Sequence, residues 1–137
     1  MTGGRVPGGV GEGFLHNADQ LGLDLTAMAR ANKRDELGVE NRLTFLFVGA
    51  LISRKGIMPL LHAWAAMPAE FRAESSLIVI GDGPQSTEAR ALANDKGLSE
   101  VTFIQRAPYE TMPTYYAAAD IFVLPTLQDL FSLVVVE

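Results

Sequence analysis

Short apolar runs recur along the chain, and each ends at a glycine, a proline or a polar loop. Four such runs cover residues 43–48, 77–80, 101–104 and 121–124. Runs of this length and composition are typical of parallel strands that are buried on both faces of a sheet. The pattern therefore predicts four buried strands, the last of them ending at Pro125.

Amphipathic stretches between these runs predict helices. Apolar residues recur at the spacing of one helical face from Ile57 to Ala65. A second helix is expected from about Ser86 to Lys96, capped by Gly97, and Pro113 fits the first turn of a third. The inner face of the third helix is expected to carry Met112, Tyr115, Tyr116 and Ala119. Alternation of strands and helices predicts an α/β fold, namely a Rossmann-like domain with three αβα layers and a mainly parallel sheet of about four strands.

The first 40 residues have a different character. Glycine is dense in residues 1–20, which favours a loop. A short helix is expected from about Leu25 to Leu37, with Leu25, Met28 and Ala29 on its apolar side and Gly38 as its cap. We therefore predict a glycine-rich lead-in with a short helix at 1–40 and a Rossmann-like domain at 41–137.

Composition narrows the class of protein. With 137 residues, 48% of them hydrophobic and 20% charged, the chain is long enough for one domain with a real core. It has neither a membrane-length apolar run nor the layout of a signal peptide, so a soluble, cytoplasmic domain is expected. The absence of cysteine and the wide separation of the two histidines disfavour a metal site. A net charge of −5 disfavours binding to nucleic acid.

Candidate chemistry lies in the loops after the strands, because ligands of such sheets bind beyond the carboxyl ends of the strands. Arg54 and Lys55 lie in the first loop, where they open the predicted helix; they fit either a phosphate clamp or a solvated basic pair. The second loop, Gly81-Asp-Gly-Pro84, is a weak dinucleotide signal and is more typical of a tight turn than of a pyrophosphate site. The fourth carries two carboxylates, Asp129 and Glu137, although three successive valines before Glu137 favour a strand.

Three phrases resemble one family, in the family's order. They are Phe47-Val-Gly-Ala-Leu-Ile-Ser-Arg-Lys-Gly56, Val79-Ile-Gly-Asp-Gly-Pro84, and the region from Tyr109 to Pro125 followed by Asp129-Leu-Phe-Ser-Leu-Val-Val-Val-Glu137. The chain is similar to the retaining nucleotide-sugar glycosyltransferases of family 4, which have the two-domain GT-B architecture. The likeness covers about residues 40–137 and concerns the C-terminal, donor-binding domain of these enzymes.

The resemblance implies roles for individual residues. Lys55 would contact the donor's diphosphate, and Asp129 stands at the first position of the family's Glu-x7-Glu motif, which binds the donor sugar. Glu137, at the second position, would hold the ribose hydroxyls. The remaining implied donor contacts are Gly83, the backbone around Arg106 and Ala107 at the base, and the backbone amides of Phe131, Ser132 and Leu133. The donor would be a nucleoside-diphosphate sugar, with no further cofactor and no metal, because lysine and a helix N-terminus can offset the leaving group's charge.

The sequence also departs from the family pattern. Ala50 stands where the family commonly has arginine, and Arg54 is the candidate substitute for that charge. Asp129 is one methylene shorter than glutamate, and Gln105 replaces a common glycine near the base-binding turn. The resemblance therefore does not carry over a particular nucleotide or sugar.

The chain is also short for the family. The resemblance implies that the N-terminal acceptor domain is missing and that the donor domain is truncated, so we expect the isolated chain to be inactive. Apolar surface at 121–124 and 133–136 predicts self-association, and the parent enzyme could be peripheral at the inner face of a membrane. Two alternatives stay open: a non-catalytic fragment, and a nicotinamide- or flavin-binding Rossmann domain, for which the first loop lacks the glycine fingerprint.

Overall fold

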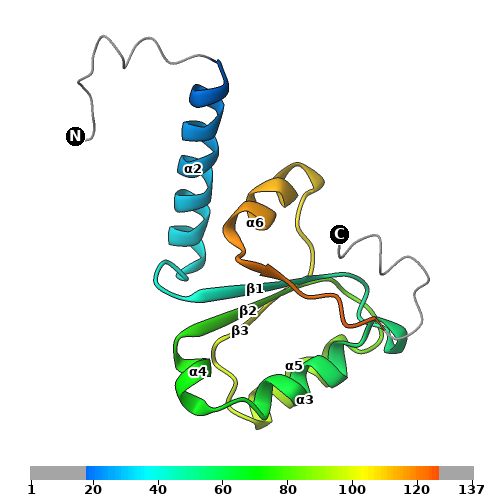
Figure 1. Ribbon diagram of the computed structural model, residues 1–137. Helices are drawn as coiled ribbons and strands as arrows, with labels where there is room; N and C mark the ends of the chain where they lie inside the picture. The colour runs from blue at the N-terminus through cyan, green and yellow to red at the C-terminus, as the bar shows by residue number, and fades with distance from the viewer. Residues whose placement is uncertain (1–17, 127–137) are drawn as a thin grey trace.

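A four-stranded parallel sheet forms the centre of the molecule (Figure 1). The computed structural model describes the backbone of residues 18–126 and the side chains of residues 26–126. The strands are β1 (Leu43–Val48), β2 (Ser75–Ile80), β3 (Val101–Ile104) and β4 (Ile121–Phe122), arranged in the order β3-β2-β1-β4. In register, Leu46 of β1 lies between Ile78 of β2 and Phe122 of β4.

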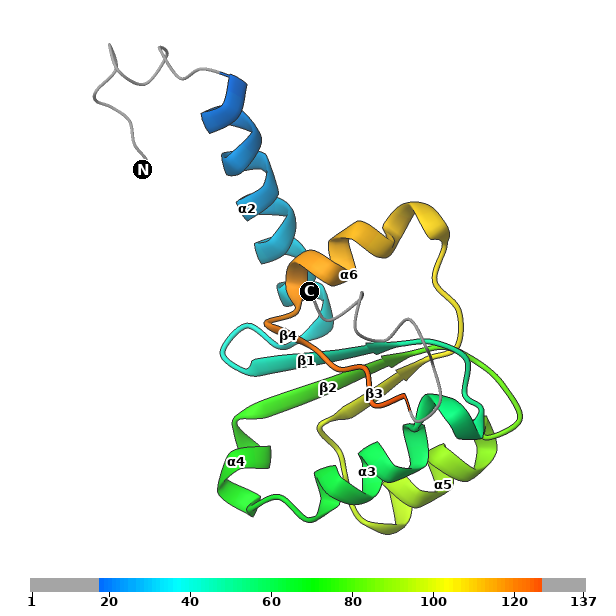
Figure 2. The same cartoon turned by 45° about the vertical axis from the view of Figure 1, so that its right-hand side comes forward.

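Helices cover both faces of this sheet (Figures 1 and 2). One face carries α3 (Ile57–Ala65), α4 (Ala69–Ala73) and α5 (Ser86–Asp95), and the other carries α2 (Ala18–Leu37) and α6 (Met112–Ala118). Two 3₁₀ turns, η1 (Ser53–Lys55) and η2 (Tyr109–Thr111), precede α3 and α6. The chain builds outward from β1 through β2 to β3 and then crosses to the far side of β1. A right-handed crossover in that reverse direction places α6 on the opposite face.

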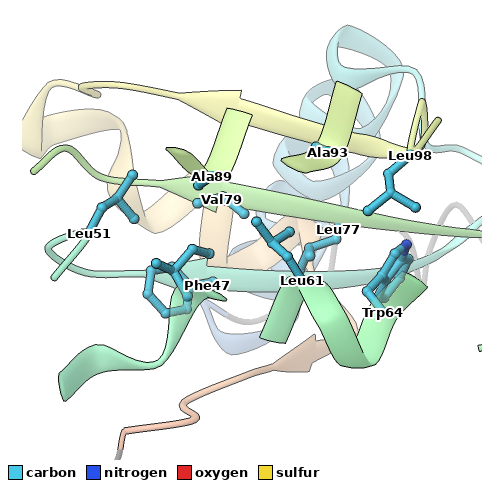
Figure 3. Close-up of a cluster of buried hydrophobic side chains, with 10 residues drawn as sticks. Phe47, Leu51, Leu61, Trp64, Leu77, Val79, Ala89, Ala93 and Leu98 are labelled. Carbon is cyan, nitrogen blue, oxygen red and sulfur yellow. The ribbon is translucent and has the colours of Figure 1, made fainter. Parts of the chain in front are cut away.

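The larger core lies between the sheet and α3 to α5 (Figure 3). Alternation along the strands turns Phe47, Leu77 and Val79 to this face and Leu46, Ile78 and Ile80 to the other. Trp64 packs edge-on against Phe45 and Phe71, with ring centroids 5.4 and 5.9 Å away. Its indole N–H donates to Glu100 at 2.7 Å, so its polar atom is satisfied although the residue is buried.

Helix α2 docks on α6 through cationic side chains. Arg30 donates to the carbonyls of Ala117 and Ala119, and Arg34 donates to that of Ala118 at 2.6 Å. These carbonyls belong to the last turn of a helix, where they have no intrahelical donor and favour positive charge. The contact thus satisfies the end of α6 and ties the first described helix to the sheet.

The Asp120 carboxylate completes this junction. It accepts hydrogen bonds from Arg30 at 2.6 Å and from the backbone N–H of Thr44 in β1 at 2.9 Å. Burial raises the pKa of Asp120, but the Thr44 hydrogen bond, the Arg30 hydrogen bond and the charges of Arg34 and Arg30 outweigh it and lower the pKa below its usual value. One ionised carboxylate therefore joins α2, β1 and the start of β4.

The predicted α/β fold with three layers and a parallel sheet is confirmed. The strands at 43–48 and 101–104 and the helix at 57–65 have the predicted bounds. Within residues 18–126 no helix combines the length and apolar character that a membrane crossing requires. The division of the chain at residue 40 stays a prediction.

Several local predictions were wrong, among them the start of the second strand, which lies at Ser75 and not at residue 77. Helix α2 begins at Ala18 and not near residue 25, since one glycine inside a helix costs only about 1 kcal/mol. Met28, which the pattern placed on the apolar side of this helix, is 58% exposed. Strand β4 has two residues and not four, and Tyr116 is 47% exposed, with its ring 5.5 Å from that of Phe122. The short helix α4 was not anticipated.

Candidate functional site

The loops that follow the parallel strands lie together at the carboxyl edge of the sheet, as the strand directions require. The sheet grows from β1 to β2 and β3 on one side, and β4 is then added on the other side of β1. The strand order therefore reverses between β1 and β4, and this edge includes the topological switch point of the fold. Arg54, Lys55, Gly83, Arg106 and Ala107, the candidate residues within the described range, all lie in or beside these loops.

Arg54 and Lys55 occupy the 3₁₀ turn η1 that follows β1. The expectation that they open the next helix was wrong, because Gly56 separates them from α3 with a left-handed φ of 81°. Arg54 is exposed, whereas Lys55 is half-buried. The two cations therefore precede the first turn of α3, on a turn held by the loops around it.

The segment after β4 passes beside the start of α3 (Figure 2), and Gly56 lets the η1 turn lie close against it. A Cβ atom at Gly56 would lie only 2.1 Å from the carbonyl oxygen of Pro125. Next to this contact, the Thr126 hydroxyl donates to the carbonyl of Arg54 at 3.2 Å. Glycine is required here on both counts, because a side chain would be strained by the backbone conformation and blocked by Pro125.

The loop after β2 supports the same turn from the other side. The Leu51 N–H donates to the Asp82 carbonyl at 2.9 Å, and the Gln85 N–H donates back to the Leu51 carbonyl at 3.0 Å. The Gln85 side chain also donates to the Ser53 hydroxyl at 3.2 Å. A Cβ atom at Gly83 would lie 2.7 Å from the Leu51 carbonyl oxygen. Gly83 thus allows close packing of the two loops, and its implied contact with a donor stays a prediction.

A side-chain pair connects the loop after β2 to the loop after β3. The Gln105 amide donates to Asp82 Oδ2 at 2.8 Å, while the N–H of Gly83 donates to Asp82 Oδ1 at 2.8 Å. The pKa of Asp82 lies below its usual value, first because of the Gln105 hydrogen bond, then because of that from Gly83, with smaller contributions from the charges of Arg106 and Arg90. Asp82 is therefore an ionised acceptor beside the base-binding turn that the sequence predicted.

The turn itself contains Arg106 and Ala107. Arg106 is exposed, and Ala107 is half-buried against the smaller core of Leu46, Ile78 and Ile80. The turn is thus anchored by packing on one side and open on the other. The sequence pointed to the backbone of this turn but did not indicate that Gln105, Gln85 and Thr126 connect the loops; an Asp-Gly pair after a strand signals only a turn.

The remaining candidate residues, Asp129, Phe131, Ser132, Leu133 and Glu137, lie outside the described residues, and their roles stay predictions. Among the described residues no three histidine or acidic side chains gather where they could hold a metal ion.

Comparison with known proteins assigns the chain to a family. The family model of the glycosyl transferases group 1 matches residues 29–137. A mannosyltransferase of Mycolicibacterium smegmatis, described as GDP-mannose-dependent and acting on phosphatidylinositol monomannoside, is 31% identical over 98 residues, which cover 71% of this chain and 25% of that protein. A D-inositol 3-phosphate glycosyltransferase of a Mycobacterium species is 32% identical over 141 residues, covering 90% and 31%.

Solved structures agree with this assignment. The lipopolysaccharide glycosyltransferase WaaG superimposes with a TM-score of 0.67 at 28% identity, over 78% of this chain and 29% of WaaG. The Anabaena protein HepE, solved with UDP and glucose, has the same fold over 80% of this chain, with a TM-score of 0.67 at 23% identity. The chain spans about a quarter to a third of the length of these relatives. Since the family model matches most of the chain and the sheet has the expected topology, the chain belongs to the group 1 glycosyl transferases.

Proposed function

We propose that this chain is the donor-binding part of a retaining glycosyltransferase, which binds a nucleoside-diphosphate sugar at the carboxyl edge of the sheet. The observation that carries the proposal is the position of Lys55 at the switch point of a group 1 domain. It lies on a turn that the loops after β2 and β4 contact closely. A half-buried lysine on a turn held by neighbouring loops is suited to a diphosphate, because the backbone that carries the charge needs little reorganisation when the ligand arrives.

The proposed chemistry is stabilisation of the leaving group. When the bond between sugar and diphosphate breaks, negative charge collects on the phosphate oxygens, and Lys55 would offset it with Arg54 as an additional cation. Asp129 would bind hydroxyls of the donor sugar and Glu137 those of the ribose. The transfer is proposed to need no metal. The base would lie against the turn at 106–107, where backbone groups can read its edge.

The relatives support this class of donor. The mannosyltransferase of Mycolicibacterium smegmatis is described as GDP-mannose-dependent, and HepE has been solved with UDP and with UDP-glucose. GDP-mannose and UDP-glucose both contain a nucleoside diphosphate and differ in base and sugar. We accordingly propose a nucleoside-diphosphate sugar as the ligand class without choosing the base.

Transfer by the isolated chain is not expected. Glycosyl transfer requires two reactants held in line with water excluded, and this chain matches only a quarter to a third of its relatives. We propose that the acceptor site of the parent enzyme is built largely by sequence that this chain does not contain. The 137-residue chain should then bind nucleoside diphosphates without transferring sugar.

The test is a titration of the 137-residue chain with UDP, GDP and ADP, followed by their sugar conjugates, observed by amide NMR shifts. Shifts are expected at Lys55 and at the turn of Arg106 and Ala107. Lys55→Ala should weaken binding roughly 10- to 100-fold, the effect of losing one charge-assisted hydrogen bond of about 1.5–3 kcal/mol.

A matched control is Lys96→Ala. Lys96 is an exposed lysine just after α5, at the opposite end of the sheet from the loops, so its removal changes the net charge equally. Equal weakening by both variants would indicate general charge attraction and refute the site. A folded chain that shows no shifts at millimolar ligand would instead support the alternative of a fragment that keeps the fold without a working site.

We further propose that the chain self-associates through the edge at β4. Ile121 and Phe122 are 40% and 38% exposed, and β4 pairs only with β1 among the described strands. An apolar strand with a bare edge favours pairing with another copy. Light scattering across a concentration series should show an increasing mean mass, and a constant monomer mass would remove the proposal.

A further inference from the structure

Hydrogen bonds connect the four loops at the carboxyl edge in series. Thr126 donates to Arg54 in the β1 loop, and Gln105 donates to Asp82 across the β2 and β3 loops. Between the β1 and β2 loops, the Leu51 N–H donates to the Asp82 carbonyl and the Gln85 N–H donates to the Leu51 carbonyl. The loop after β1 and the loop after β2 are thus joined by more than one backbone hydrogen bond. At the other side, the Gly81 N–H donates to the carbonyl of Ile104 at the end of β3 at 2.9 Å. Beyond that bond, the described part of the chain joins the β3 loop to the β2 loop through one side-chain hydrogen bond, that from Gln105.

Gln105 differs from the residue that the family resemblance leads one to expect. The family commonly has glycine at this position, and glycine has no side chain with which to reach Asp82. In this chain the amide reaches the carboxylate at 2.8 Å from the position directly before Arg106. The contact is therefore a feature of this sequence and not of the fold alone.

Both oxygens of Asp82 are used in a way that fixes the pair. Oδ1 accepts the N–H of Gly83 in its own loop, which orients the carboxylate, and Oδ2 accepts the amide of Gln105. A carboxylate can only accept, so the amide must present its nitrogen. The pair is exposed to solvent, so it contributes little to global stability. Any effect of the pair is therefore local, at the backbone where Gln105 leads into the turn.

From this geometry we infer that Gln105 is a positioning residue, which acts through Asp82 to fix the turn at 106–107 and thereby sets the preference for the nucleotide base. The part that concerns the base rests on the proposed function. Gln105 itself has no assigned contact with a donor, and the Lys55 turn is held by other bonds, so diphosphate binding should not depend on Gln105.

The first test needs no ligand. In the 137-residue chain, Gln105→Ala should lower the backbone order parameters at residues 105–107 from about 0.85 to below about 0.7. The pKa of Asp82, followed by carboxyl NMR shifts against pH, should rise toward its ordinary value, because its largest lowering contact is removed. Gln105→Glu should behave like Gln105→Ala at neutral pH, where two carboxylates repel, and should recover rigidity as one of them is protonated.

The second test measures ligand preference. Gln105→Ala should change the ratio of Kd values between the best and the worst of UDP, GDP and ADP by roughly fivefold, about the effect of one neutral hydrogen bond. The Kd for inorganic pyrophosphate should stay within about twofold. Asn94→Ala, which removes an exposed amide on α5, serves as the control and should change neither quantity.

The two tests separate this inference from the proposed function. Unchanged order parameters and an unchanged Asp82 pKa in Gln105→Ala would overturn the positioning role whether or not nucleotides bind. Equal weakening of every ligand, pyrophosphate included, would also overturn it, because the residue would then support the site in general. If the unaltered chain binds no nucleotide, the proposed function fails for this chain and the claim on base preference falls with it; the relaxation data still decide whether Gln105 fixes the turn.

Discussion

Replacing Gly56 by alanine tests how tightly the Lys55 turn is held against the loop after β4. Two independent features oppose the substitution. The backbone of Gly56 has a φ of 81°, which alanine rarely adopts, and the new Cβ atom would lie 2.1 Å from the carbonyl oxygen of Pro125 and 3.0 Å from its carbonyl carbon. Neither contact involves a flexible side chain that could move aside, so one of the two loops must shift.

The size of the effect can be estimated from these two terms. The left-handed conformation costs an alanine roughly 1–2 kcal/mol. A normal carbon–oxygen contact is longer than 3 Å, so the loops must separate by about 1 Å, and forcing an extra carbon into a packed site typically costs about 1–3 kcal/mol. We therefore expect Gly56→Ala to lower the free energy of unfolding by about 2–5 kcal/mol, a large part of the roughly 5–15 kcal/mol that a domain usually has.

The chain provides its own control. Gly38 has a similar φ of 72°, but a Cβ atom there would meet nothing within 4 Å. Gly38→Ala should therefore show only the conformational term, about 1–2 kcal/mol. The difference between the two variants isolates the contact between Gly56 and Pro125.

Urea unfolding followed by tryptophan fluorescence is a suitable assay, because the one tryptophan of the chain, Trp64, is 5% exposed in the main core. With a slope of about 1–3 kcal/mol per molar urea, the contact term should lower the midpoint of Gly56→Ala below that of Gly38→Ala by roughly 1 M. Equal midpoints for both variants would refute the conclusion that the two loops are in rigid contact, and with it the argument that Lys55 lies on a fixed turn.

Two further changes test the junction of α2 and the main core. Asp120→Asn should lower stability at neutral pH by about 1–2 kcal/mol, discounted because the carboxylate is 28% exposed. Folding lowers the pKa of Asp120, so the contribution of its carboxylate to stability is present above the ordinary pKa of about 3.9 and is lost as pH falls through the lower pKa of the folded state. The difference in unfolding free energy between the unaltered chain and Asp120→Asn should therefore shrink as pH falls from about 5 toward about 2. A difference that stays constant with pH would contradict the assignment. Trp64→Phe should lower the free energy of unfolding by about 1.5–3 kcal/mol, measured by urea unfolding followed by circular dichroism, because Glu100 loses a hydrogen bond at 2.7 Å. The same loss should raise the pKa of Glu100. An unchanged pKa would contradict the conclusion that the indole N–H stabilises the ionised carboxylate.

The elements of the sheet could be predicted because their signal is local. The runs at 43–48 and 101–104 are apolar throughout or nearly so, a composition that favours strands in a parallel sheet. The predicted burial on both faces holds throughout β2 and in part for β1, but it was wrong for β3, where Thr102 is exposed. The last strand was predicted too long for a physical reason. Val123 still donates to Leu46 at 2.8 Å, but Pro125 has no N–H to continue the ladder, and its carbonyl faces Gly56.

The site could be predicted only in part. The loops of the candidate site follow from the rule that ligands bind beyond the carboxyl ends of parallel strands, and the structure places Lys55 and the turn at 106–107 in those loops. Their roles toward a donor stay predictions. The bonds that hold those loops could not be predicted, since they join residues far apart in the sequence. Thr126 and Arg54 are 72 positions apart, and Gln105 and Asp82 are 23. No periodic pattern records which polar side chains will meet across such a distance.

Helix α2 shows why a search for apolar stripes can misplace a docked helix. It docks on the last turn of α6, whose carbonyls need hydrogen-bond donors. Arg30 and Arg34 supply these donors, so the contact is made by cationic side chains where other helix pairs pack apolar ones. The same cations bind Asp120, which also accepts from β1 and directly precedes β4. Since β4 leads through Pro125 and Thr126 to the Lys55 turn, the anchoring of α2 bears on the geometry of the proposed donor site. Helix α2 is thus connected to the site through hydrogen bonds and one ionised carboxylate.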